Sequence, residues 1–368
     1  MAPWKRVLGT AVGAVDRAVV LAMQMRGARQ HAREEGLSHD ERIAALDHIY
    51  EAYGREENVG DPEVFFPTPP PIDPRLELVR SGSPPRSETF DASWPSTSTP
   101  FLSDVAERYL SNVDNRTARA RLYLGEAGRS AAKRPAIIAI HGYMGGQWLL
   151  EEAQWPIAWL VRRGLDVALP LLPFHAARGG ARRGAPQLPS SDPRMTNEGF
   201  RQAVGDILAL ARWLRARGAP HVGVMGMSLG GFTTSLLATV TRGELDFAMP
   251  MIPLASVADF AREQGRLGEG ERADAQHAAL ERANRIVSPL ARPLAIPKER
   301  TLVVAAEHDR ITPSAHARRI AGHFGCEMLL FPGGHLVQLG RSEAFRALGD
   351  LLEGEGVIPP RPRRRAAR

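Results

Sequence analysis

The chain has 368 residues, of which 43% are hydrophobic and 24% are charged, a balance typical of a globular protein with no membrane-spanning run of about 18 apolar residues. The formal net charge is +6, but five of these charges are arginines among residues 361–368, so the nearly neutral remainder predicts no nucleic-acid-binding surface. A single cysteine, Cys326, excludes an intramolecular disulfide and a multi-cysteine zinc site, and it fits a reducing compartment, so we expect a cytoplasmic protein.

Residues 1–75 form a predicted helical extension that ends in a linker. Apolar residues between Trp4 and Met23 follow one helical stripe, which predicts a first helix. Ser38 and Glu41 have the spacing of a capping box, so a second helix is expected from there to about Tyr53. The proline-rich segment 54–74 predicts an extended linker. We expect the first helix to pack on the body of the protein, and peripheral contact with a membrane surface is the alternative.

Residues 76–355 read as one α/β domain. Apolar strand-like runs occur at 118–124, 136–140, 166–171, 221–225, 245–252, 301–305 and 326–331, and helical stretches occur at 147–163, 196–217, 229–241, 313–323 and 336–352. This alternation predicts a mainly parallel sheet with helices on both faces. Residues 253–300 interrupt the alternation with about two charged helices and have the size of a cap inserted over a site. Residues 356–368 are predicted to be a basic, disordered tail.

A candidate nucleophile lies between a strand and a helix. Gly226-Met227-Ser228-Leu229-Gly230 matches Gly-x-Ser-x-Gly, with an apolar run before it and a helix-favouring segment after it. Such a sharp turn strains the backbone of the serine and holds its hydroxyl at a helix N-terminus, where developing negative charge is stabilised. The alternative is that Ser228 only caps the helix.

From about residue 118 to 353 the sequence resembles the α/β-hydrolase superfamily. This resemblance implies the order nucleophile, acid, histidine, each in a loop after a strand. His335 follows the strand run 326–331 and is the expected base. Asp309, in the loop after 301–305, is the expected acid, with Glu307 as its competitor and an ion pair with Arg310 or Arg318 as the alternative for either carboxylate.

The same loop also predicts where the next helix begins. Thr312 has the residue type of an N-cap and Pro313 that of a first helical position, so the helix after the acid is expected to begin there.

The loop after the strand 136–140 reads His141-Gly142-Tyr143-Met144-Gly145-Gly146 and resembles the superfamily loop that supplies an oxyanion donor. The resemblance implies the backbone N–H groups of Tyr143 and Leu229 as donors, with Met144 as the alternative to Tyr143. His141 is expected to have a structural role rather than a catalytic one. Whether the Tyr143 side chain points into the site or packs beside it stays open.

Several other functions are excluded by missing motifs. No lysine has the setting of a P-loop, no Gly-x-Gly-x-x-Gly follows a strand and no His-Glu-x-x-His occurs, so no nucleotide, dinucleotide or zinc-protease site is predicted. We therefore expect a serine hydrolase that cleaves a small-molecule or lipid carboxylic ester through an acyl-enzyme, without metal or organic cofactor. The alternatives are a non-catalytic binding protein on the same fold, and a peptidase or amidase using the same triad.

A basic loop adds a hypothesis on the substrate. Arg178, Arg182 and Arg183 follow the strand run 166–171 on the side of the expected site, so they are candidates to contact a carboxylate or phosphate of the substrate. A solvated basic loop is the alternative.

Overall fold

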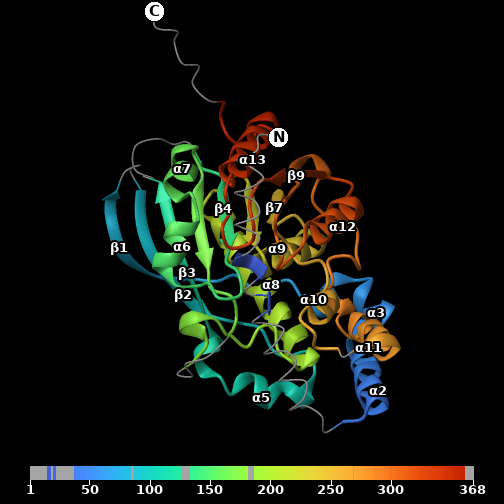
Figure 1. Ribbon diagram of the computed structural model, residues 1–368. Coiled ribbons are helices and arrows are strands. Elements are labelled where there is room, and N and C mark those ends of the chain that lie inside the picture. Colours follow the sequence, from blue (N-terminus) through green and yellow to red (C-terminus); the bar gives the residue numbers. More distant parts are fainter. Residues whose placement is uncertain are drawn as a thin grey trace, which may run out of the picture.

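The computed structural model describes residues 15–17, 20–21, 37–83, 87–125, 133–180, 186–267 and 269–360 (Figure 1). Most of the predicted first helix and the arginines of the predicted tail lie outside these residues. No described helix combines the length and the apolar composition needed to cross a bilayer.

A nine-stranded sheet runs through the described residues in the order β1-β2-β3-β5-β4-β6-β7-β8-β9. The strands are β1 (Arg75–Ser83), β2 (Ser87–Pro95), β3 (Thr117–Gly125), β4 (Ala136–Ile140), β5 (Asp166–Pro170), β6 (Val222–Met227), β7 (Phe247–Met251), β8 (Leu302–Ala306) and β9 (Glu327–Phe331). The strands from β5 to β9 pair in parallel, and β1, β2 and β3 are joined to that region by antiparallel pairing. The mainly parallel sheet that the sequence predicts is therefore present.

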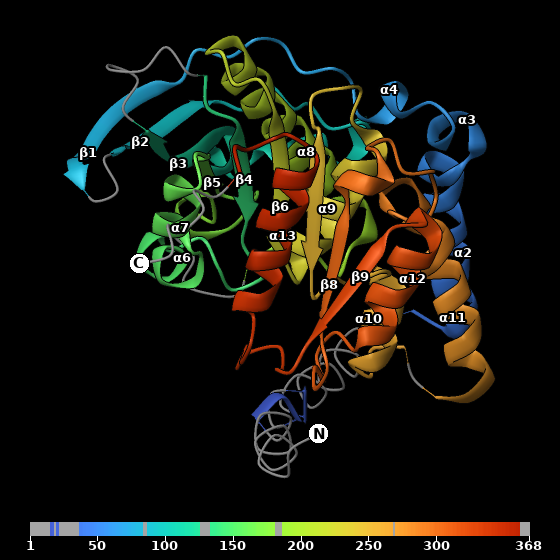
Figure 2. The ribbon, with the colours of Figure 1, turned by 90° about the horizontal axis from the view of Figure 1, so that it is seen from above.

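Both faces of the sheet are covered by helices, because successive side chains of a strand point to opposite faces and both sets are apolar. In β4, for example, Ile138 belongs to one buried apolar cluster and Ile137 to the other. The first cluster includes residues of α8 (Pro193–Ala216), α9 (Leu229–Val240) and α12 (Ser314–Phe324). The second includes residues of α7 (Ile157–Arg162) and α13 (Ser342–Gly354), with α6 (Trp148–Gln154) beside them. Figure 2 shows α13, α6 and α7 together on one side of the sheet.

Two strands and two helices differ from the sequence prediction. β1 and β2 were not predicted, and they extend the sheet at its antiparallel edge. The single helix expected at 147–163 is two helices, α6 and α7, separated at Trp155 and Pro156, where proline disrupts the helical hydrogen bonds. The last helix begins at Ser342 rather than at 336, because residues 335–341 form a loop in which Gly340 has a φ of 84°.

The segment expected to be an extended linker packs into the core instead. After α2 (His39–Ile49) and a π-helical turn (Tyr50–Gly54), it forms α3 (Glu56–Val59) and α4 (Pro62–Phe65). Tyr53, Phe65 and Phe66 are buried in the first apolar cluster. The prolines favour an extended chain, but the free energy of burying the aromatic residues between them outweighs that preference. The capping box of Ser38 and Glu41 is present as predicted.

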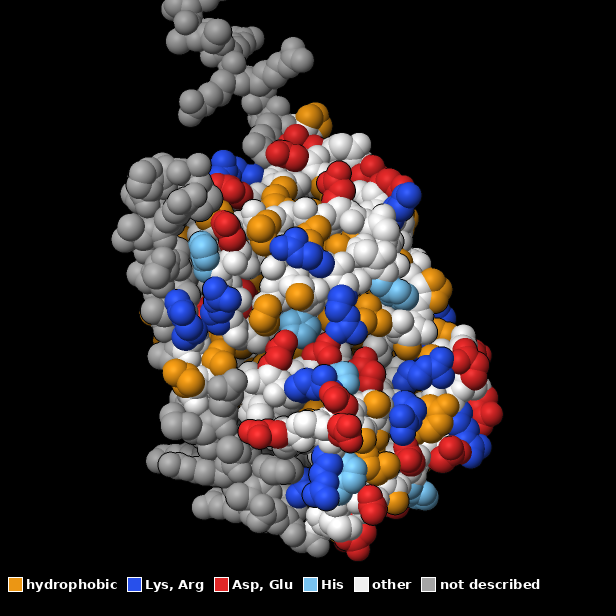
Figure 3. Space-filling model, turned by 45° about the vertical axis from the view of Figure 1, so that its right-hand side comes forward, with side chains coloured by type: hydrophobic (Ala, Val, Ile, Leu, Met, Phe, Trp, Pro, Cys, Tyr) orange, Lys and Arg blue, Asp and Glu red, His pale blue; other side chains and the backbone are white. Residues whose placement is uncertain are grey.

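The insertion 253–300 contains α10 (Val257–Glu263) and α11 (Gly270–Ala283), the two helices expected there. α11 lies against α2, with an ion pair between Arg282 and Asp47. On this side of the molecule basic and acidic side chains are interspersed (Figure 3), and ion pairs such as Arg262–Asp274 and Arg319–Asp259 join them. This face therefore carries no large field of one sign.

The remaining short elements connect these layers. They are α5 (Ala106–Leu110) and the single 3₁₀ turns Ser103–Val105, Val113–Arg116, Ala176–Arg178, Arg285–Val287 and Lys298–Arg300.

Candidate active site

Ser228 occupies the turn between β6 and α9 in a strained conformation. Its φ of 57° and ψ of −113° lie in a region that residues with a side chain rarely adopt. Such strain costs about 1–3 kcal/mol and persists only where the surrounding structure imposes it. The strand–turn–helix setting that the sequence predicts is present, so the serine side chain stands at the N-terminus of α9.

Glycines around Ser228 are required by close backbone approach. A Cβ on Gly226 would lie 2.2 Å from the carbonyl oxygen of Gly230, and one on Gly230 would lie 2.1 Å from that of Ile140. A Cβ on Gly231 would lie 2.6 Å from the carbonyl oxygen of Met251. These distances are far below van der Waals contact, so the Gly-x-Ser-x-Gly-Gly sequence is what permits α9 to begin directly against β4 and β7.

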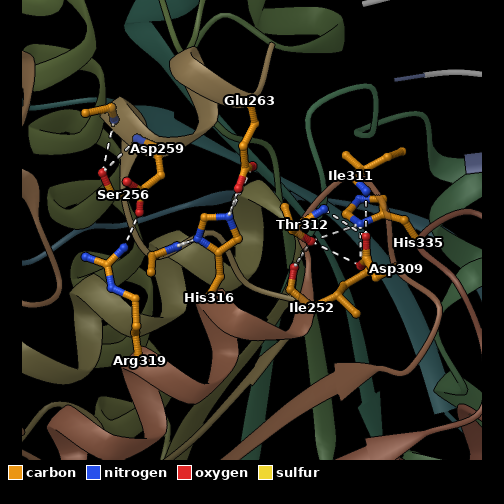
Figure 4. Close-up of polar contacts among 12 residues, drawn as sticks. Ile252, Ser256, Asp259, Glu263, Asp309, Ile311, Thr312, His316, Arg319 and His335 are labelled. Atoms are coloured by element: carbon orange, nitrogen blue, oxygen red, sulfur yellow. Dashed lines mark hydrogen bonds and ion pairs between the residues drawn. The ribbon is translucent and has the colours of Figure 1, made fainter. Parts of the chain in front are cut away.

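Asp309 and His335 meet although 26 residues separate them in the sequence. The Nδ1 atom of His335 lies 2.8 Å from Oδ2 of Asp309 (Figure 4). Asp309 follows β8 and His335 follows β9, so both lie beyond the carboxyl edge of the sheet. The Asp309 side chain is 0% exposed and that of His335 10% exposed. A hydrogen bond at this distance between a buried carboxylate and an imidazole fixes the orientation of the ring.

The remaining acceptor sites of Asp309 are also occupied. Oδ1 accepts the backbone N–H groups of Ile311 at 2.9 Å and Thr312 at 2.8 Å. The Thr312 hydroxyl lies 3.1 Å from Oδ2 of Asp309, 3.1 Å from Nδ1 of His335 and 2.9 Å from the carbonyl oxygen of Ile252 (Figure 4). The carboxyl group is therefore held in place by hydrogen bonds from its own loop.

Thr312 was predicted to be the N-cap of the following helix, and this prediction is wrong. α12 begins at Ser314, with Pro313 in the N-cap position. The Thr312 hydroxyl is turned toward the Asp309–His335 pair instead.

The alternatives weighed for Asp309 find no support in its contacts. Glu307 is exposed at the surface, whereas Asp309 is buried. Among the described residues the ion-pair partner of Asp309 is His335, and not Arg310 or Arg318.

The loop after β4 lies beside Ser228. A Cβ on Gly142 would lie 3.7 Å from Cβ of Ser228, in ordinary van der Waals contact, so the backbone of this loop passes about one methyl group away from the nucleophile candidate. Glu151 accepts the N–H of Gly146 at 2.8 Å and the indole N–H of Trp155 at 3.0 Å, which fixes the far end of the loop. The Tyr143 hydroxyl donates to the carbonyl oxygen of Pro186 at 3.2 Å.

His141 is held as a neutral ring inside the protein. Its Nε2 accepts the N–H of Leu172 at 3.0 Å, so Nδ1 carries the proton and donates to the carbonyl oxygen of Gly142 at 2.7 Å. Burial lowers the pKa of His141 to about 4. Burial also lowers the pKa of the neighbouring His175 to about 3. Both of these hydrogen bonds of His141 are with the backbone, in agreement with the structural role expected for it.

Of the arginines proposed to bind an anionic substrate group, the structure describes Arg178, which is not available to a ligand. Arg178 is fully buried, and its guanidinium donates to Asp206 at 2.8 Å and to the carbonyl oxygens of Leu171 and Asn115. It is therefore part of the interior, where the buried charge needs those partners. Arg182 and Arg183 lie outside the described residues.

Two residues near the Asp309–His335 pair, called the dyad below, were not identified as site residues from the sequence. Besides Thr312, Asp16 from the N-terminal extension accepts the backbone N–H of His335 at 2.7 Å. No motif marks an aspartate in an amphipathic helix as a partner of a loop more than 300 residues away.

No cluster of three or more metal-ligating side chains occurs within the part of the chain that the structure describes.

Comparison with known proteins gives relatives of low identity. No family model matches the sequence. The uncharacterized protein Rv2627c of Mycobacterium tuberculosis strain H37Rv is 29% identical over 322 residues, which are 85% of this chain and 76% of that protein. Acetyl xylan esterase from Paenibacillus sp. R4 superimposes with a TM-score of 0.56 at 14% identity, covering 83% of this chain and 98% of that one. Acetyl Xylan Esterase 1 from Thermoanaerobacterium sp. JW/SL YS485 has a TM-score of 0.51 at 17% identity, with the same coverage.

Proposed function

Because the chain has the α/β-hydrolase fold, we propose that it is a serine hydrolase in which Ser228, His335 and Asp309 cleave a carboxylic ester. The observation that carries this proposal is the 2.8 Å contact between His335 and the buried carboxylate of Asp309. This pair lies in the loops that follow β8 and β9. These strands belong to the same sheet as β6, and Ser228 directly follows β6. A serine, a histidine and an aspartate in these places have the roles of nucleophile, base and orienting acid.

Acylation follows from the state of the imidazole. Since Nδ1 of His335 bonds to Asp309, Nε2 is the nitrogen that takes the proton of the Ser228 hydroxyl. The serine oxygen then attacks the ester carbonyl, and the tetrahedral oxyanion accepts hydrogen bonds from the backbone N–H groups of Tyr143 and Leu229. The imidazolium, stabilised by Asp309, returns the proton to the leaving alcohol, and an acyl-enzyme remains.

Deacylation reverses these roles. His335 takes a proton from water, the hydroxide attacks the acyl-enzyme, and Ser228 leaves with the proton that the imidazole returns.

Two features support the proposed oxyanion donors. Leu229 is the first residue of α9, where the N–H groups have no partner within the helix. The loop after β4, which carries Tyr143, comes close to Ser228 at Gly142.

An ester rather than an amide is proposed because both solved structures named above are described as acetyl xylan esterases. Two exposed apolar side chains belong to the loops of the proposed site, and we infer from them a preference for an apolar acyl group. Met144, in the loop after β4, is 68% exposed, and Leu336, next to His335 in sequence, is 52% exposed. A panel of p-nitrophenyl esters from acetate to palmitate tests the preference for an apolar acyl group. An anilide of the preferred acyl group tests the choice of an ester over an amide. Cleavage of the anilide at a rate equal to that of the ester would contradict the choice of an ester.

Labelling by a fluorophosphonate probe tests the nucleophile. The native protein should be labelled and Ser228→Ala should not be. Ser235→Ala is the matched control, since Ser235 lies two turns along the same helix and its hydroxyl donates to the carbonyl oxygen of Gly231. Ser228→Ala should also lower the rate of ester hydrolysis by about 10⁴-fold or more. A native protein that neither reacts with the probe nor hydrolyses any ester of the panel would instead be a binding protein on this fold.

A further inference from the structure

The described part of the N-terminal extension places a carboxylate behind the candidate active site. Residues 15–17 are helical, and Val15 and Arg17 are exposed while Asp16 between them is 0% exposed. Figures 1 and 2 both show this short blue ribbon beyond the carboxyl edge of the sheet, next to the loop between β9 and α13. A buried aspartate is rare unless its charge is paired or hydrogen-bonded, so its partners show what it does.

The partners of Asp16 come from both loops of the dyad. Oδ2 accepts the backbone N–H of His335 at 2.7 Å and that of Arg310, the residue after Asp309, at 3.4 Å. Oδ1 accepts the backbone N–H of Leu336 at 3.2 Å. One side chain therefore bridges the loop that carries the acid and the loop that carries the base.

Other hydrogen bonds also hold the histidine loop, such as those from the N–H of Gly334 to the carbonyl oxygen of Val337 and from the Gln338 amide to the carbonyl oxygen of His335, both at 3.0 Å, but it is Asp16 that binds the N–H of His335. The loop contains Gly333, Gly334 and Gly340, and between β9 and α13 it has no regular secondary structure. Hydrogen bonds to an ionised carboxylate are about twice as strong as those between neutral groups. Without Asp16, the N–H of His335 would lose the acceptor that lies 2.7 Å away. The loop would then have to shift so that this N–H could bond to water instead.

We propose that Asp16 is a positioning residue of the active site, which holds the backbone of His335 so that its imidazole stays between Asp309 and Ser228. This inference rests on the proposed function. It also assigns a role to the N-terminal extension, which completes the site by bringing one carboxylate to the two catalytic loops. A displacement of about 1 Å in a catalytic group can cost about 10²-fold in rate, so a bond to the backbone of the base is expected to affect turnover.

The experiment replaces Asp16 in the full-length protein. Asp16→Asn keeps the shape but removes the charge and turns an amide N–H₂ toward backbone donors. We expect kcat for p-nitrophenyl acetate to fall about 10- to 100-fold while KM changes less than about two-fold. Asp16→Glu keeps the charge and should retain more of the kcat than Asp16→Asn. Leu21→Ala is the control, because Leu21 lies on the same segment with its side chain exposed, and it should match the native protein.

Hydrogen exchange of the peptide 332–341, measured by mass spectrometry, provides a readout that does not depend on catalysis. In Asp16→Asn, but not in Leu21→Ala, exchange of this peptide should become faster while the rest of the sheet is unchanged. Unchanged kcat in Asp16→Asn, or equal losses of kcat in Asp16→Asn and Asp16→Glu, would overturn the proposal. If the native protein lacks esterase activity and probe labelling, the proposed function fails, whereas exchange still decides whether Asp16 holds the loop.

Discussion

Replacing Asp309 by asparagine changes the proton on the imidazole without changing the shape of the site. Oδ1 of Asp309 accepts two backbone N–H groups, from Ile311 and Thr312, so the oxygen of an asparagine must take that place. Its amide N–H₂ then faces Nδ1 of His335, which can only accept. The ring is forced into the tautomer that carries its proton on Nε2, where it can no longer act as the base for Ser228.

The magnitude follows from the loss of a correctly protonated base. In serine proteases, the equivalent aspartate-to-asparagine change lowers kcat by about 10⁴-fold, which corresponds to about 5.5 kcal/mol of transition-state stabilisation. We expect a loss of the same order for Asp309→Asn, with KM little changed, because Asp309 is buried and does not reach the substrate.

Steady-state hydrolysis of p-nitrophenyl acetate measures this loss, and a circular dichroism melt verifies that the variant is folded. Glu307→Gln is the matched control, since Glu307 lies two residues away in the same loop but is exposed. It should keep kcat within about two-fold of the native value. A folded Asp309→Asn protein that keeps more than a tenth of the native kcat, or a larger loss in Glu307→Gln, would refute the assignment of the acid.

Three further outcomes are expected. A Cβ on Gly230 would lie 2.1 Å from the carbonyl oxygen of Ile140, so Gly230→Ala should destabilise the protein by at least about 1–3 kcal/mol in urea unfolding and abolish probe labelling; native labelling would contradict the close approach. Phe65→Ala should cost about 3–5 kcal/mol in the same assay, because Phe65 is fully buried in the core; a loss below about 1 kcal/mol would show that the segment is a separate extension. Burial lowers the pKa of His175 to about 3, so below pH 6.5 the unfolded chain binds a proton that the native ring does not, and stability falls with pH. Between pH 7 and pH 5 this residue contributes about 2 kcal/mol of that fall, so the unfolding free energy of His175→Gln should fall by about 2 kcal/mol less than that of the native protein; parallel curves would contradict the neutral, buried state of the ring.

The sequence predicted the elements that depend on neighbouring residues. The seven parallel or core strands from β3 to β9 are within about two residues of the predicted runs, because an apolar run bounded by turn residues is a local signal. The setting of Ser228 was predictable for the same reason, since a strand, a glycine-rich turn and a helix follow each other within a few residues. The capping box at Ser38 and Glu41 is equally local.

Only the tertiary structure decided which side chains meet across the chain. The sequence favours Asp309 over Glu307 only through the superfamily resemblance, whereas the structure separates them by the burial of Asp309 and its contact with His335. Phe65 stands in a proline-rich stretch whose composition favours an extended chain, yet the free energy of burying its ring outweighs that preference. Asp16 contacts residues about 300 positions away, and no periodicity or motif encodes such a pairing, because it arises from how the completed sheet presents its loops.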